Sequence, residues 1–188
     1  MTITYIVSSK TLSKFKQKAR ELKKSAGIPH HEALEQVAKN IGLPNWHKMA
    51  KSAEITAQTE SAFLSGLIVA FDIKDGGSFD PADTFVEDDQ AIEFCEKDLV
   101  ASYRQACEDE GEPATEEEVE EYRQFEVGNH VFFRYVGKDS PQNVREALNI
   151  VNAQSFWPPL YVWLNGKFNE TYNENATSDD GEVVGVRF

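Results

Sequence analysis

Long apolar runs are missing from this sequence. The longest, Gly66–Phe71, has the length of a strand, whereas roughly 20 apolar residues are needed to cross a bilayer. The first residues, Met1–Val7, contain neither a basic leader nor a long apolar core, so we expect no signal peptide. The sequence therefore predicts that no membrane is among the partners.

Cysteine is almost absent. The two cysteines, Cys95 and Cys107, fall in one predicted helix, twelve positions apart. At 3.6 residues per turn they lie about 18 Å apart along the helix axis, which is far beyond the reach of a disulfide. We expect two reduced thiols, and reduced thiols favour a cytoplasmic location.

Basic residues are scarce relative to acidic ones, and the two signs are unevenly distributed. The chain has 19 Lys and Arg against 32 Asp and Glu, for a net charge of −13. Residues 1–55 carry ten basic and four acidic side chains, whereas residues 56–188 carry nine basic and 28 acidic. This asymmetry predicts two parts, a basic helical head over 1–55 and an acidic body over 56–188, joined by the short polar segment Ala53–Glu60.

The head has the periodicity of a small helical module. Apolar residues recur at helical spacing from Ser9 to a terminating Gly27, and again over His30–Ile41. Asn45 is a suitable cap for a third, short helix. We expect the three helices to enclose a small core around Trp46.

The head also permits a second interpretation, as a nucleic-acid-binding helix-turn-helix. Ala38 and Gly42 have the spacing of the alanine and the turn glycine in such motifs. The short third helix and the lysines at 48 and 51, where aliphatic residues are usual, favour a solvated basic surface instead. The lysines that would contact nucleic acid under this alternative are Lys14, Lys18, Lys24, Lys48 and Lys51.

Part of the head resembles a known module. The run His31-Glu-Ala-Leu-Glu35, followed by Ala38, Gly42 and Asn45-Trp46, is similar to a short helical module of plasmid- and phage-borne bacterial proteins, some labelled glyoxalase-related. The resemblance covers roughly residues 10–52 and implies a mobile-element setting, without an activity. The body lacks the repeated metal-binding βαβββ units that the glyoxalase label requires.

The body predicts an α+β fold. Its strongest local signal is Asn165-Gly166, the preferred pair of a type I′ hairpin, between Leu160–Leu164 and Lys167–Tyr172. Thr115 and Glu118 have the spacing of a capping box, which predicts that a helix begins at Thr115. We expect a mostly antiparallel sheet with helices on one face. The other predicted elements are strands over 63–73, 130–136 and 183–188, a helix over 88–108, and a helix from Ser140-Pro141.

Local signatures of catalysis and of cofactor binding are missing. His31-Glu32 is followed by Glu35 where a zinc protease needs its second histidine, and Gly76-Gly77 lacks the Lys and Ser/Thr of a phosphate-binding loop. We therefore predict no metal, no cofactor and no catalytic residue. A third hypothesis keeps an enzyme whose site is assembled from distant residues, centred on Asp72, His130 and Tyr135.

The segment Asp72–Glu126 is the most unusual feature, with twenty acidic and four basic side chains. A solvated surface that keeps the protein soluble explains it simply. The functional hypothesis is a docking surface for a basic protein partner, whose carboxylates imitate the phosphates of DNA as anti-restriction or anti-CRISPR proteins do. Our leading prediction is a non-enzymatic interaction or regulatory protein. The predicted partner-binding residues are Asp109, Glu110, Glu116, Glu117, Glu118, Glu120 and Glu121.

Overall fold

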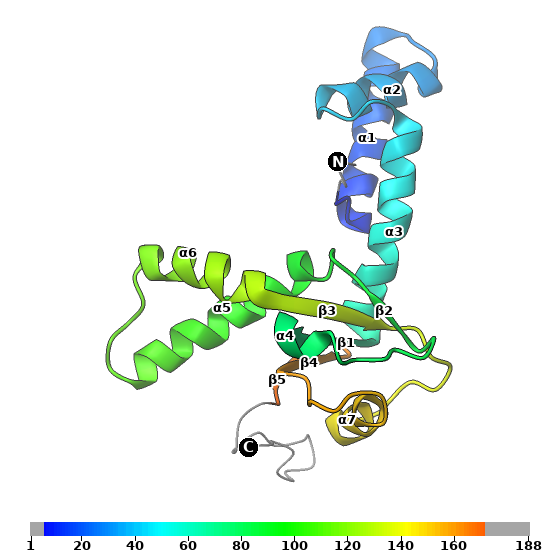
Figure 1. The fold of residues 1–188 in the computed structure, drawn as a ribbon. Coiled ribbons are helices and arrows are strands. Elements are labelled where there is room, and N and C mark those ends of the chain that lie inside the picture. The colour runs from blue at the N-terminus through cyan, green and yellow to red at the C-terminus, as the bar shows by residue number, and fades with distance from the viewer. Residues whose placement is uncertain (1–5, 172–188) are drawn as a thin grey trace. The chain divides into compact units, whose positions relative to one another are not determined.

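A computed structural model describes residues 6–171 of the chain, which divides into two compact units, Met1–Glu60 and Ser61–Phe188 (Figure 1). The boundary lies inside one continuous helix, α3 (Trp46–Ser65). The prediction of a short third helix is therefore wrong. The segment Ala53–Glu60, predicted as a polar joint, is helical, and the boundary between the two units falls at its end. The segment contains no helix breaker, and its Ala53 and Thr56 are buried; the Thr56 hydroxyl donates to the Ser52 carbonyl at 2.9 Å, a bond that a helix accommodates.

The first unit consists of α1 (Ser9–Ala26), α2 (His30–Asn40) and most of α3. Gly27 ends α1 with a φ of 64°, as the sequence predicts. Asn45 caps α3, since its Oδ1 accepts a hydrogen bond from the Lys48 amide at 2.8 Å. The end of α1 and the start of α3 were therefore predictable from sequence.

The core of the first unit has a different centre from the one expected. Met49 is fully buried among Val7, Ala38, Leu43 and Ala53. Trp46 is only partly buried and packs against the edge of this cluster. The prediction that Trp46 forms the centre is wrong, because Trp46 is the first residue of α3 and Met49, about one turn further along, occupies the enclosed position. The Glu35 carboxylate accepts a hydrogen bond from the Trp46 amide at 3.2 Å.

The second unit contains a five-stranded antiparallel sheet in the order β2-β3-β1-β4-β5, which confirms the α+β class (Figure 1). The strands are β1 (Leu67–Asp72), β2 (Phe85–Glu87), β3 (His130–Tyr135), β4 (Tyr161–Leu164) and β5 (Lys167–Glu170). The helices are α4 (Ile73–Gly76), α5 (Ile92–Asp109), α6 (Glu116–Phe125), the 3-10 turn η1 (Val127–Asn129) and α7 (Val144–Asn152).

Helices pack on both faces of this sheet, which corrects the expectation of one covered face. Val69 and Phe71 of β1 pack with Val151 of α7 in one cluster. Ile68 of the same strand packs with Leu99 of α5 in another. Because successive residues of a strand point to opposite faces, the continuous apolar run of β1 fits a strand that is buried on both sides.

Several element boundaries differ from those predicted. The strand expected from Phe63 begins at Leu67, because Phe63 still belongs to α3. The short strand β2 was not predicted. The Asn165-Gly166 turn is confirmed, with φ values of 51° and 76°. The strand predicted over 183–188 lies outside the described residues.

Candidate partner-binding surface on helices α5 and α6

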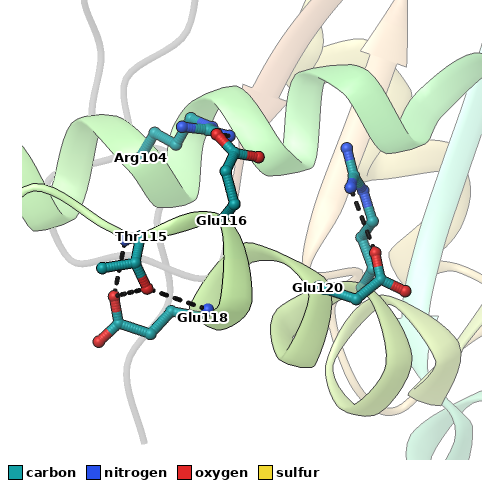
Figure 2. Close-up of polar contacts among 6 residues, drawn as sticks. Arg104, Thr115, Glu116, Glu118 and Glu120 are labelled. Carbon is teal, nitrogen blue, oxygen red and sulfur yellow. Dashed lines mark hydrogen bonds and ion pairs between the residues drawn. The ribbon is translucent and has the colours of Figure 1, made fainter.

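The helices α5 and α6 form a hairpin that carries the densest charge of the chain. Between Glu108 and Glu126 there are ten carboxylate side chains and one basic one, Arg123. The Thr115 hydroxyl accepts from the Glu118 amide at 3.3 Å, and the Thr115 amide donates to the Glu118 carboxylate at 2.7 Å. This capping box, predicted from sequence, is confirmed and fixes where α6 begins (Figure 2).

One set of α6 carboxylates connects the two helices. Glu116 Oε1 lies 2.8 Å from an Arg104 nitrogen of α5 (Figure 2). Arg123 Nε lies 2.7 Å from Glu96 of α5, and its Nη1 lies 3.4 Å from Glu120. The hydrogen bond from Arg104 lowers the pKa of Glu116, so this carboxylate stays ionised at neutral pH. These contacts connect α5 and α6 along the hairpin and engage Glu116 and Glu120.

A second set of carboxylates is exposed beside these pairs. Glu110, Glu117 and Glu121 are exposed, and within residues 6–171 none of them forms an ion pair. Asp109 accepts a hydrogen bond from the Gln105 amide at 2.9 Å. Of the seven acids predicted to bind a partner, those not engaged by an arginine or by the capping box retain most of their capacity to accept hydrogen bonds.

A shallow cleft of about 350 Å³ opens between the two helices. Its floor is aromatic, because Tyr103 of α5 and Tyr122 of α6 stack with ring centroids 4.3 Å apart and planes 4° apart. Within the described part of the chain, its lining includes three carboxylates and no basic side chain. The lining residues are Tyr103, Glu118, Glu121, Tyr122, Phe125 and Glu126.

The two tyrosines differ in how they are held. A hydrogen bond with the Cys107 side chain raises the pKa of Tyr103, and burial and then the nearby charges of Glu118 and Glu121 raise it further. Burial, followed by the neighbouring Tyr161, raises the pKa of Tyr122 well above its usual range. Both phenols therefore stay neutral at physiological pH, and their rings lie in a strongly negative field.

Sequence reasoning missed the aromatic part of this cleft. Glu118, Glu121, Tyr122 and Phe125 recur at helical spacing, so a single face of α6 was visible as a pattern. That pattern is also the pattern of a core-facing stripe. Only the packing of α6 on α5 shows that Tyr103 completes an open surface there.

The predicted nucleic-acid-binding lysines lie on two helices of the first unit, and all are exposed. Lys14, Lys18 and Lys24 belong to α1, whereas Lys48 and Lys51 belong to the first turns of α3. The Lys18 ammonium lies 5.7 Å from the Phe15 ring centroid, so its stem partly covers an apolar side chain. Lys14 and Lys24 give α1 a solvated basic surface, and Lys48 and Lys51 add exposed basic groups on α3.

The residues of the enzyme hypothesis do not form one site. Asp72 and His130 are paired across β1 and β3. Tyr135 lies at the other end of β3, about 17 Å away at strand spacing, and its hydroxyl donates to the Asp139 carbonyl at 2.9 Å. Burial lowers the pKa of His130, whose ring packs against Tyr161 instead. The hypothesis of one catalytic centre formed by all three residues is therefore wrong.

Membrane-spanning and metal-binding features are missing from the described part of the chain. Within residues 6–171, no helix has the length and apolarity needed to cross a membrane. In the same range, no three His, Cys, Asp or Glu side chains are grouped so that they could hold a metal ion. In comparisons with protein-family models, curated proteins and solved structures, the chain matches none of them. The case for function therefore rests on the geometry of the surface.

Proposed function

We propose that this chain is a non-enzymatic binding protein that captures a basic partner protein through the acidic surface of α5 and α6. One observation carries the proposal: the ten carboxylates between Glu108 and Glu126 exceed the arginines that pair with them. Arg104 and Arg123 neutralise Glu116 and Glu120 within the hairpin. The remaining charge is unneutralised there, and a partner of opposite charge complements it.

Such a surface acts mainly on the rate and selectivity of association. Complementary potentials steer a basic protein toward the hairpin and repel acidic competitors. A protein that normally binds nucleic acid has the required basic surface, so inhibition by mimicry of DNA remains our prediction for the biological role. The cytoplasmic location and the mobile-element setting are part of the same proposal.

The direct test uses an arginine-rich peptide and a neutral counterpart in which citrulline replaces arginine. We expect the arginine-rich peptide to bind, with affinity that falls as salt rises, and the citrulline peptide not to bind. Fluorescence anisotropy of labelled peptides measures both affinities. Equal binding of the two peptides, or none, contradicts the proposal.

A pair of charge variants locates the binding surface. The first neutralises the exposed acids at the tip of the hairpin, with Glu108, Asp109, Glu110 and Glu112 changed to their amides. The control neutralises four acids of another segment, Asp80, Asp83, Glu87 and Asp89, all of which are exposed. Both variants have the same net charge, so a weaker complex for the first alone assigns binding to α5 and α6.

A second candidate function, nucleic-acid binding by the first unit, is favoured by one structural observation. The helix that follows the turn glycine is not short: α3 extends over 20 residues, and Gly42 adopts a φ of 81°. Exposed Lys48 and Lys51 lie on its first turns. This removes the objection based on helix length.

The test of this alternative is a titration of duplex and single-stranded oligonucleotides at low salt. If the head binds duplex DNA, the slope of log affinity against log salt is negative. Its magnitude decreases by about 0.9 for each phosphate that Lys48→Ala or Lys51→Ala no longer neutralises. No binding of either nucleic acid at low salt eliminates the alternative and leaves the acidic surface as the only proposed interface.

A further inference from the structure

The acids of α6 lie on two faces of the helix with different neighbours. Glu116 and Glu120 face arginines, as described above. Glu118, Glu121 and Glu126 line the cleft with the two stacked tyrosines. Positions 118, 121, 122, 125 and 126 share one helical face, which accounts for this separation. The cleft therefore combines carboxylates with aromatic rings, whereas the tip of the hairpin offers carboxylates alone.

This combination of groups has a specific chemical preference. A cation above an aromatic ring is attracted by the ring quadrupole, and carboxylates at the rim add charge-assisted hydrogen bonds. Arginine satisfies both requirements, since its planar guanidinium stacks on rings and presents five donors. Lysine has a more strongly hydrated point charge, so it gains less from the aromatic floor.

The volume of the cleft and its exposed apolar surface also fit an arginine side chain. A volume of about 350 Å³ is at the lower end of the range for ligand pockets and suits one long side chain. Phe125, which lines the cleft, is 64% exposed. An aliphatic stem that lies along this ring removes apolar surface from water. Glu118 bonds Thr115 through Oε2, and its Oε1 has no hydrogen-bond partner within residues 6–171.

We propose that the cleft lined by Tyr103, Tyr122, Phe125 and three glutamates receives an arginine side chain of the basic partner protein. The proposal rests on the proposed function and adds to it a single anchoring residue type. Long-range attraction by the hairpin tip brings the partner close, and the cleft then selects arginine over lysine. Most of the selectivity is expected in the dissociation rate, because short-range interactions break only when the complex separates.

The first experiment compares arginine-rich and lysine-rich peptides of equal length and charge. Binding by charge alone gives the two peptides equal affinities. Recognition in the cleft makes the arginine peptide bind roughly three- to tenfold more tightly, the range expected for a cation–π contact at a partly exposed site. Isothermal titration calorimetry or anisotropy with both peptides measures this ratio.

Two matched pairs of variants assign the ratio to the cleft. Tyr103→Leu removes the ring and is expected to abolish the preference for arginine, whereas Tyr103→Phe keeps the ring and retains it. Glu121→Gln weakens binding of the arginine peptide more than Glu117→Gln does. Both glutamates are exposed on α6 and neither forms an ion pair within the described residues, but only Glu121 lines the cleft.

The outcomes separate this inference from the proposed function. If both peptides bind with equal affinity, and Tyr103→Leu and Glu121→Gln behave like their controls, the acidic surface stands and the arginine cleft is overturned. If neither peptide binds, the proposed function itself fails. Circular dichroism of each variant verifies the fold. Should Tyr103→Leu unfold, the comparison of Glu121→Gln with Glu117→Gln keeps the test decisive, since only Glu121 lines the cleft.

Discussion

At the scale of single residues, side chains of one type have different roles according to their neighbours. Glu116 and Glu117 are adjacent in sequence, yet the first pairs with Arg104 and the second forms no ion pair within residues 6–171. Exposed pairs of this kind contribute little to stability, because water screens them and two side chains lose freedom. Their effect is mainly to decide which carboxylates remain available to a partner.

The two cysteines differ in the same way and give a direct test of the structure. Cys95 is fully buried, and its burial raises the pKa of its thiol well above the usual range, whereas Cys107 is half-buried on the same helix. Because the thiolate is the reactive form, we expect iodoacetamide to modify Cys107 in the folded protein and Cys95 only after denaturation. Mass spectrometry of intact protein and of its peptides measures this. Equal labelling of both in the folded state contradicts the packing of α5.

The capping box of α6 gives a prediction that depends on pH. Thr115→Ala removes the hydroxyl at the start of the helix and should lower the free energy of unfolding by about 1 kcal/mol at neutral pH. The Thr115 amide and hydroxyl lower the pKa of Glu118. The stabilisation is therefore complete when the pH is above the pKa of Glu118 in the unfolded chain, about 4.3. It is lost as the pH falls through the lower pKa that Glu118 has in the folded protein.

Urea denaturation of the wild type and of Thr115→Ala, at neutral pH and in acid, measures both effects. We expect the difference between the two proteins to decrease in acid, because protonated Glu118 is a weaker acceptor. Thr115→Ser is the control, since serine keeps the cap, and it should remain close to wild type. A Thr115→Ala protein as stable as wild type at neutral pH shows that α6 does not depend on the box.

At the scale of elements, the sequence predicted those features that depend on residues close together in the chain. The Asn165-Gly166 turn and the Thr115–Glu118 box involve neighbours in the chain, and both are confirmed. The length of α3 and the strand β2 depend on partners far away in sequence. β2 exists because it pairs with β3, as Val86 with Arg134, and three residues alone have too little pattern to reveal it.

The candidate site shows the same division. Glu118 and Glu121 were among the predicted partner-binding acids because a run of glutamates is visible in one segment. The cleft was not predictable, since the stack of Tyr103 on Tyr122 connects residues of two helices. Sequence likewise suggested one covered sheet face, because it cannot show which helix packs on which side of β1.

Two glycines of the second unit give a matched test of these elements. Gly166 has a φ of 76° in the hairpin turn, where an alanine is strained, so Gly166→Ala should cost about 1 kcal/mol. Gly77 has a φ of −66°, and an added Cβ meets nothing within 4 Å. Gly77→Ala should therefore be neutral or slightly stabilising. Thermal and urea denaturation rank the three proteins, and equal stability of both variants refutes the turn geometry.

At the scale of the whole molecule, charge rather than fold is the unusual property. The second unit has an ordinary doubly covered sheet, whereas the segment Asp72–Glu126 carries twenty acids against four bases. Selection for solubility alone requires no such concentration on one segment, because a modest net charge suffices. Self-repulsion of this charge opposes folding, and the basic partner that we propose would relieve it on binding. Under that proposal, binding and stability are coupled.

This coupling predicts how the stability of the free protein depends on salt. Ions screen repulsion among the excess carboxylates and also weaken the few exposed ion pairs, but the carboxylates are far more numerous. We therefore expect the Tm to rise as sodium chloride is increased from low to moderate concentration. The amide variant of Glu108, Asp109, Glu110 and Glu112 should start from a higher Tm and respond less to salt, because part of the repulsion is already removed. Circular dichroism melts of both proteins measure this. A Tm that falls with salt means that ion pairs such as Arg104–Glu116 outweigh the repulsion, and then a basic partner gains nothing from relieving it.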